Sequence, residues 1–447
     1  MSQTRRAIRA YVALVAMALA FVALIAPAAH AQRDSTGGVR IGLTYKAGTR
    51  PGVVVLPIAG AGGDSLQAIL ERDLDFGDRV TVVGGEAGRA LLPAAGTGGR
   101  VNYDLAARLG GAAVLQVTLV PTGAHVALHD VAAKQVMNVR DFALPSGAPT
   151  AQPWRLAVHA VADEIERWVT GVRGIAASRI AFVRDGQVWT IDADGEGVHA
   201  VTSGTGSLSP AWHPSGRYIA YSQFQRTGAQ VLVKDLASGS SRALVASPGG
   251  INLTPVFSRA EPNLIAYAHG LAEGTDIVTA DWTATTGARR VTIGRGTENV
   301  GPTFSPDGRR MAFTSGRLGH PEVYITDVDG TNAELLTPYE FGDQNYRSSP
   351  DWSPDGRAVA FQSRIGGRFQ VMTIALRDRS VKQHTSDGAN EDPSWAPDGR
   401  HLVFTSTRTG GRQLFVLDTE SGRTRQLTRG STARLAAWSP PLAVAAP

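Results

Sequence analysis

The chain has 447 residues, no cysteine and a formal net charge of +5. This length exceeds one ordinary domain and allows two or three, and the lack of cysteine excludes disulfides, thiolate metal ligands and lipid attachment at a cleaved signal. The 51 Gly and 24 Pro, with 7% aromatic residues, are typical of a protein rich in strands and turns.

The first 31 residues have the pattern of an export signal. Three arginines precede an apolar run from 11 to 26, and Ala29–Ala31 offers the small residues that a signal peptidase needs. A membrane-spanning helix is disfavoured because the run is short. Without this segment the formal charge falls to +2, so no nucleic-acid partner is predicted. The mature chain is expected to begin at Gln32 and to be soluble outside the cytoplasm.

Residues 32–45 form a predicted N-terminal arm. A polar stretch, RDSTGG, is followed by the alternating sequence VRIGLTY. Two interpretations stay open for this segment: a free arm that binds a partner, or an edge strand of the domain that follows.

Residues 46–173 alternate between strand and helix patterns and predict a small α/β domain. The glycine-rich AGAGGD turn matches neither a dinucleotide fingerprint nor a P-loop, so it is interpreted as a strand-to-helix turn. No two histidines here have ligand spacing on one helix, so no metal site is predicted. The expected elements are a strand at Val53–Ile58, a helix capped by Asp64, a helix near Tyr103, a strand at Ala113–Val120, a hairpin of His125–Asp130 with Gln135–Phe142, and a helix at Trp154–Thr170.

Residues 174–440 repeat one phrase: an aromatic residue, Ser or Ala, Pro, Asp, Gly, then a basic residue and an apolar strand. Intact copies begin at Phe304, Trp352 and Trp395, and degenerate copies at Trp212, Phe257 and Trp438. These aromatic anchors recur every 43 to 48 residues, which is the period of a propeller blade. Two further strands and a turn follow the apolar strand of each copy from Trp212 to Trp395 and the matching strand at Ile180, so six four-stranded blades are predicted.

The ends of the repeat region predict how the ring closes. The first blade, starting at Ile180, lacks an innermost strand, whereas the copy at Trp438 has no blade after it. The C-terminal strand is therefore expected to complete the first blade, with 441–447 as a short tail. Turns at Asp192 and Asp327 resemble the start of a calcium loop but lack its glutamate, so they are interpreted as hairpin turns.

The order of these parts resembles the TolB family. An export signal and a small α/β domain are followed by the TGVRG linker, the strand RIAFV, six SPDG-type blades and an ending in AWSP. The resemblance implies a non-catalytic periplasmic scaffold of the Tol–Pal system, without cofactor or metal. It would link the outer-membrane lipoprotein Pal to inner-membrane Tol proteins, for envelope integrity and constriction at cell division. A monomer without a membrane span in the mature chain is expected.

The resemblance also implies two binding sites. A TolA-like partner would contact the arm through Val39, Arg40 and Ile41. Pal would contact residues just before the innermost strands, at one mouth of the channel, where loops on a rigid scaffold converge. These residues are Ile251, Asn252, Thr254, Asn299, Val300, Gly301, Ser348, Ser349, Glu391, Asp392 and Arg434.

Two positions depart from the family pattern. Residues 258–263 read SRAEPN where SPDG is expected, and Ile251 aligns with the family's usual histidine.

Two other functions stay open from the residues alone. A stand-alone secreted propeller that binds a polysaccharide or small ligand would share the fold. A propeller hydrolase is disfavoured, because the sequence has no G-x-S-x-G motif and shows only scattered candidate carboxylates and histidines.

Overall fold

The structure is a computed structural model that describes residues 43, 49–85, 101–244, 250–284, 287–294, 296–338 and 345–443. The predicted signal and the predicted TolA contacts Val39, Arg40 and Ile41 lie outside the described residues. Within the described ranges, each helix is too short or too polar to cross a bilayer.

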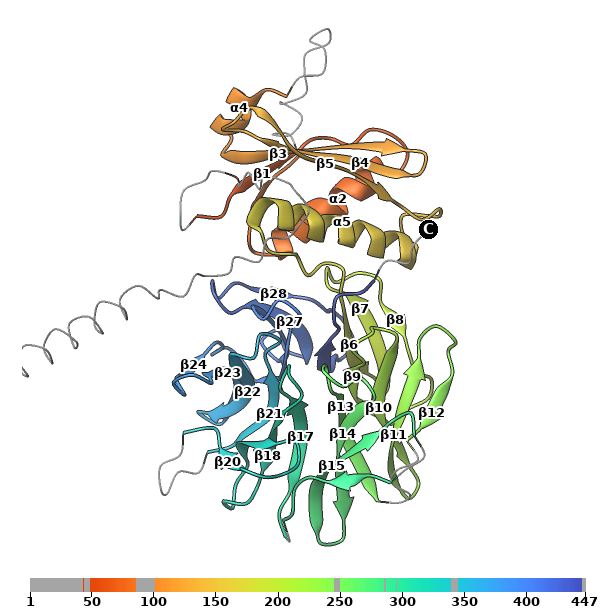
Figure 1. Cartoon of the computed structure of the whole chain (residues 1–447), viewed down its shortest axis with the longest axis vertical. Helices are drawn as coiled ribbons and strands as arrows, with labels where there is room; N and C mark the ends of the chain where they lie inside the picture. The colour runs from red at the N-terminus through yellow and green to blue at the C-terminus, as the bar shows by residue number, and fades with distance from the viewer. Residues whose placement is uncertain are drawn as a thin grey trace, which may run out of the picture. The chain divides into compact units, whose positions relative to one another are not determined.

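An α/β layer comes first in the described chain (Figure 1). Its five-stranded sheet has the order β2-β1-β3-β4-β5, in which β1 runs parallel to both of its neighbours. Alternate residues of the strands face opposite sides, so Val53 packs with helices α2 and α5, whereas Val54 packs with α4. The bounds are β1 Gly52–Val55, α2 Gly63–Phe76, β2 Thr81–Val83, α4 Tyr103–Arg108, β3 Gly111–Val120, β4 Gly123–Asp130, β5 Gln135–Ala143 and α5 Gln152–Thr170.

The glycine-rich turn before α2 differs from the sequence prediction in its cap. Gly62 is the N-cap, with a φ of 84°, and makes no side-chain cap bond. Asp64 lies inside the first turn instead, where its carboxylate faces the positive end of the helix dipole. A Cβ on Gly63 would stand 2.1 Å from the carbonyl oxygen of Ile58. Close backbone packing therefore explains the glycines, as predicted for a structural turn.

The described strands of the second part form six four-stranded blades (Figure 1). Blades 2 and 3 join into one eight-stranded sheet through a single pair, Ala229 with Ile251. The blades are β29-β6-β7-β8 (Arg434–Trp438, Arg179–Arg184, Gln187–Asp192, His199–Ala200), β9 to β12 (Ser207–Trp212, Tyr218–Gln225, Gly228–Asp235, Ser241–Ala243), β13 to β16 (Ile251–Phe257, Leu264–Leu271, Gly274–Asp281, Arg289–Arg290), β17 to β20 (Asn299–Phe304, Arg310–Ser315, Glu322–Asp327, Glu334–Leu335), β21 to β24 (Arg347–Trp352, Ala358–Ile365, Arg368–Ala375, Val381–Gln383) and β25 to β28 (Asn390–Trp395, His401–Ser406, Gln413–Asp418, Thr424–Gln426).

The repeated phrase builds the turn between the first two strands of a blade. In blade 5 the Ser353 hydroxyl donates to Asp355 at 2.6 Å and accepts from the backbone N–H of Arg357 and of Ala358. Gly356 has a φ of 74°, which glycine adopts without strain. The anchor Trp352 is 1% exposed and packs with residues of blades 4 and 5. The phrase therefore has a structural role in the blade.

The last strand closes the ring, as predicted. β29 pairs antiparallel with β6, with Trp438 opposite Ile180. The ring N–H of Trp438 donates to the Ser178 hydroxyl at 2.8 Å, and the backbone N–H of Ser439 donates to the carbonyl of Arg179 at 2.8 Å. The innermost strand of blade 1 is thus supplied by the other end of the propeller.

Deleting residues 433–447 should destabilise the propeller as a whole, because blade 1 loses its inner strand. Burying a Trp side chain is worth about 3 to 5 kcal/mol, so the thermal midpoint should fall by about 10 °C or more. Calorimetry of the full-length chain and of the chain without residues 433–447 measures this change in the thermal midpoint. A chain that lacks only residues 444–447 is the control. An unchanged midpoint after the longer deletion would refute closure by β29.

Candidate functional site

The innermost strands of all six blades share one irregularity. Each shows a register shift against its neighbouring strand. At that point each has one residue whose φ lies between 49° and 60°. These residues are Ser209, Thr254, Gly301, Ser349, Asp392 and Leu435. We call them the bulge ring.

The bulge ring lines the channel. Five of its members precede a proline, which suits a bulge because proline has no N–H for the strand ladder. A positive φ costs a non-glycine residue about 1 to 3 kcal/mol, so the surrounding propeller must hold this geometry. The ring and its prolines surround a cavity of about 190 Å³. Bulges of this kind re-aim side chains, here into the channel.

Four of the predicted Pal contacts, Thr254, Gly301, Ser349 and Asp392, belong to this ring. They also connect adjacent blades. The backbone N–H of Gly301 donates to the Thr254 hydroxyl at 3.2 Å, and the Ser349 hydroxyl donates to Asp392 at 3.1 Å. The structure therefore places these four residues at one level of the channel.

Burial raises the pKa of Asp392 to about 6, although the hydrogen bond from Ser349 favours the charged form. The neighbouring Glu391 adds to the rise because two carboxylates repel each other. Glu391 forms an ion pair with Arg412, with the guanidinium nitrogen 3.5 Å from the carboxylate oxygen. On the side of blade 6 the channel thus carries a carboxyl group, that of Asp392, whose pKa is raised.

The other predicted contacts occupy three kinds of position. Val300, Ser348, Glu391 and Arg434 each precede a member of the bulge ring. Ile251 begins β13 and is 47% exposed.

Asn252 and Asn299 are buried and bonded across blade boundaries. The Asn252 amide donates to the carbonyl of Ala229, and the Asn299 amide donates to Asp276. These two side chains therefore contribute to packing between blades.

Sequence reasoning missed two members of the bulge ring, Ser209 and Leu435. The signal for five of the six members was present as a proline two residues before the anchor aromatic. Leu435 lacks it, because Ala436 stands at the proline position.

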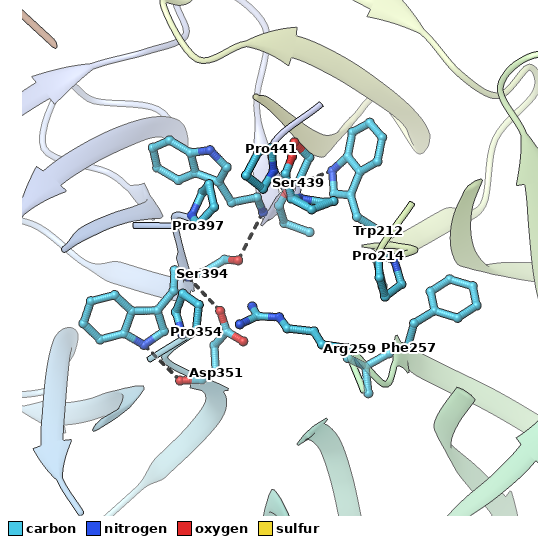
Figure 2. Close-up of a pocket in the computed structure, with 16 residues that line it drawn as sticks. Trp212, Pro214, Phe257, Arg259, Asp351, Pro354, Ser394, Pro397, Ser439 and Pro441 are labelled. Atoms are coloured by element: carbon cyan, nitrogen blue, oxygen red, sulfur yellow. Dashed lines mark hydrogen bonds between the residues drawn. The ribbon is translucent and has the colours of Figure 1, made fainter. Parts of the chain in front are cut away.

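The channel continues into a second cavity of about 310 Å³ at the other end of the inner strands. Five residues line both cavities, among them Asp351 and Ser394, so the cavities are successive segments of one channel. Figure 2 shows Trp212, Phe257 and several prolines around the second cavity, with the Arg259 side chain extending through it toward Asp351. Its walls are therefore largely apolar, with one cation and one carboxyl group.

Asp351 connects blade 5 to its neighbours. It accepts from the backbone N–H of Trp395 at 2.7 Å and from the Thr303 hydroxyl at 3.3 Å. Burial raises the pKa of this carboxyl group, although the nearby Arg259 charge opposes the rise.

A family model described as the TolB beta propeller domain matches residues 166–442. The chain belongs to this TolB propeller family. The Tol-Pal system protein TolB of Bordetella pertussis is 31% identical over 254 residues, which are 54% of this chain and 57% of that protein. TolB of Bordetella bronchiseptica matches at the same identity over 56% of its length. The chain thus spans about half the length of the curated relatives that it matches.

Solved structures extend the likeness. The crystal structure of TolB from Acinetobacter baumannii is 25% identical, has a TM-score of 0.75, and covers 88% of this chain and 97% of that one. Hydrazine synthase from Kuenenia stuttgartiensis, an enzyme, is 11% identical with a TM-score of 0.51 over 59% of this chain and 47% of that one. That second likeness concerns the propeller fold alone.

A first buried charge cluster lies around His159 of α5, next to blade 1. The Nδ1 of His159 is 2.7 Å from Asp73 of α2, and its Nε2 is 3.6 Å from Asp192 of β7. Arg155 pairs with Asp192 at 3.0 Å and with Asp194 at 2.6 Å. Although burial opposes it, the charge of Asp73 and the hydrogen bonds to Asp192 and Asp73 raise the pKa of His159 to about 10.

A second cluster has His401 of β26 at its centre. Its Nδ1 lies 2.8 Å from Asp398, the Asp of the repeated phrase, and its Nε2 lies 3.3 Å from Asp78. Arg400 and Arg423 pair with Asp418 and Asp78. Burial alone would lower the pKa of His401, but hydrogen bonds to the two carboxylates raise it to about 9.

Both clusters contain three groups whose ligand atoms lie within 4.8 Å of one another: Asp73, His159 and Asp194, and Asp78, His401 and Asp418. In each, a carboxylate is already bound by an arginine, Asp194 by Arg155 and Asp418 by Arg400. A metal ion would have to compete with that cation, and the positive charge favoured on each histidine opposes ligation. These groups fit ion-pair networks better than metal sites.

The His401 network makes stability depend on pH. Because the folded-state pKa of about 9 exceeds the ordinary 6.5, the stabilisation is complete below pH 6.5 and is lost as pH rises through 9. Urea unfolding should show His401→Gln reducing the loss of stability between pH 6 and pH 9 by about 1 to 3 kcal/mol. His199→Gln, at an exposed position, should leave that loss unchanged. Equal losses in wild type and His401→Gln would contradict the assignment.

Proposed function

We propose that this chain is a non-catalytic binding scaffold of a Tol–Pal system in the periplasm, linking an outer-membrane peptidoglycan-associated lipoprotein to inner-membrane Tol proteins. The observation that carries the proposal is the match to TolB of Acinetobacter baumannii over 88% of the chain. That share is larger than the blades alone, so the likeness includes the α/β layer. The proposed role is in envelope integrity and in constriction at cell division.

The lipoprotein would bind at the channel mouth around the bulge ring. Ring closure and the bonds between blades make this surface rigid, so little conformational entropy is lost on binding. Ile251 offers exposed apolar area beside the mouth, and Glu391 and Arg434 offer charges of both signs. Such charges set the association rate and orientation of a partner more than its affinity.

Ile251→Glu should weaken binding of the organism's own peptidoglycan-associated lipoprotein at least about tenfold, because it places a charge in an apolar contact. Val381→Glu is the matched control, since Val381 is 40% exposed on the outermost strand β24 of blade 5. Calorimetric titration of the mature chain with the periplasmic domain of the lipoprotein measures both.

Equal affinities of the two variants for the lipoprotein would contradict binding at the channel mouth. If the unmodified chain did not bind the lipoprotein, a stand-alone propeller for a polysaccharide or small ligand would be favoured instead.

The N-terminal arm would bind a TolA-like partner through Val39, Arg40 and Ile41. The supporting observation is its attachment point, since Leu43 is partly buried against the α/β core. The residues that precede this anchor can then reach a partner without disturbing the core.

Deleting residues 32–41 should abolish association with the TolA-like protein and leave the thermal midpoint unchanged, because Leu43 and the described core are kept. Surface plasmon resonance and calorimetry on the same sample separate the two effects. Lipoprotein binding serves as the control and should be retained. Undiminished TolA binding after the deletion would refute the assignment.

A further inference from the structure

The degenerate phrase of blade 3 puts a cation where the other blades have proline. In five blades the second residue after the anchor aromatic is a proline. These residues are Pro214, Pro306, Pro354, Pro397 and Pro440. In blade 3 the position holds Arg259, which lines the second cavity together with four of the prolines. Figure 2 shows its side chain reaching across the cavity toward Asp351.

The Arg259 charge acts on Asp351 through space. The side chain is exposed to the cavity, and no hydrogen bond or ion pair joins it to another described residue. Its electrostatic effect reaches Asp351, but that carboxyl group already accepts hydrogen bonds from Trp395 and Thr303. The guanidinium therefore keeps its donors available for a ligand.

The walls of the cavity suit an apolar molecule. The ring N–H groups of three lining tryptophans are already bonded: Trp212 to the carbonyl of Ala437, Trp395 to that of Asp351, and Trp438 to the Ser178 hydroxyl. Together with Phe257 and the prolines, these tryptophans line the cavity with apolar groups. A volume of about 310 Å³ lies at the lower end of the range for small-molecule sites.

We propose that this cavity binds a small organic monocarboxylate, with its carboxylate on Arg259 and its apolar body against the tryptophans. A guanidinium matches a carboxylate because two parallel N–H groups can each donate to one oxygen. One arginine balances one negative charge, and a dianion such as a phosphate ester would place a second charge near Asp351. The site lies beyond the bulge ring and does not depend on the proposed lipoprotein contact.

The test uses the mature chain and five probes: benzoate, phenylacetate, 3-phenylpropionate, cyclohexanecarboxylate and hexanoate. Their primary amides have almost the same shape without the charge. Titrations followed by ligand-observed NMR should show at least one acid binding in the millimolar range or tighter, and its amide at least about tenfold weaker, because hydrogen bonds to charged groups are the stronger ones. No binding by any acid, or equal binding of acid and amide, would overturn the proposal.

Variants then locate the site. Arg259→Gln keeps a polar side chain without the charge and should weaken the acid at least about tenfold. Arg309→Gln is the matched control, since Arg309 is exposed on the equivalent turn of blade 4 and is not among the residues lining the cavity. Unchanged affinity in Arg259→Gln would overturn the proposal. The comparison of acid with amide on the unmodified chain does not depend on how the variants fold.

Discussion

The antiparallel pairing of β29 with β6 is the contact on which the propeller depends. A blade buries its anchor aromatic against the preceding blade, so an open ring would leave one face of blade 1 and one of blade 6 uncovered. The pairing prevents this by placing Trp438 in a single buried cluster with Ile180 and Phe182 of blade 1 and with Val403 and Val416 of blade 6. The ends of the ring are therefore held by both hydrogen bonds and apolar packing.

A closed ring also explains the geometry of the channel. Six inner strands carry the same bulge, and five of the six bulge residues adopt a positive φ that is unfavourable for their side chains. Bonds between blades support this geometry: Thr303, Asp351 and Ser394 each accept from the backbone N–H of the next blade's anchor. The backbone at the bulge is thus nearly uniform around the ring, whereas the bulge residues differ in size and polarity, from Gly301 to Leu435. Differences in binding chemistry along the channel arise from side chains on a common backbone.

Much of this architecture could be predicted from sequence, because it rests on periodic patterns. The spacing of the anchor aromatics predicts six blades, and the incomplete copy at Trp438 predicts the closure.

Short elements and backbone details could not be predicted in the same way. β2 has only three residues, too few to show an alternation of apolar and polar residues. Asp64 was predicted as the N-cap of α2 because the sequence does not reveal the left-handed turn at Gly62. The partners of His401 include Asp78, more than three hundred residues earlier, so only the fold brings them together. Arg259 was noticed as a departure from the phrase, but its position in the channel required the structure.

The closure also determines when the molecule can fold. Arg179 and Ser439, which bond where the ring closes, are 260 residues apart in the chain, and loops of this length close slowly. Blade 1 emerges first of the six but cannot be completed until the last strand has been delivered. A chain that emerges from its N-terminus therefore keeps its propeller unfinished until β29 is available. The circular order of the strands thus delays the native propeller until the whole repeat region is available.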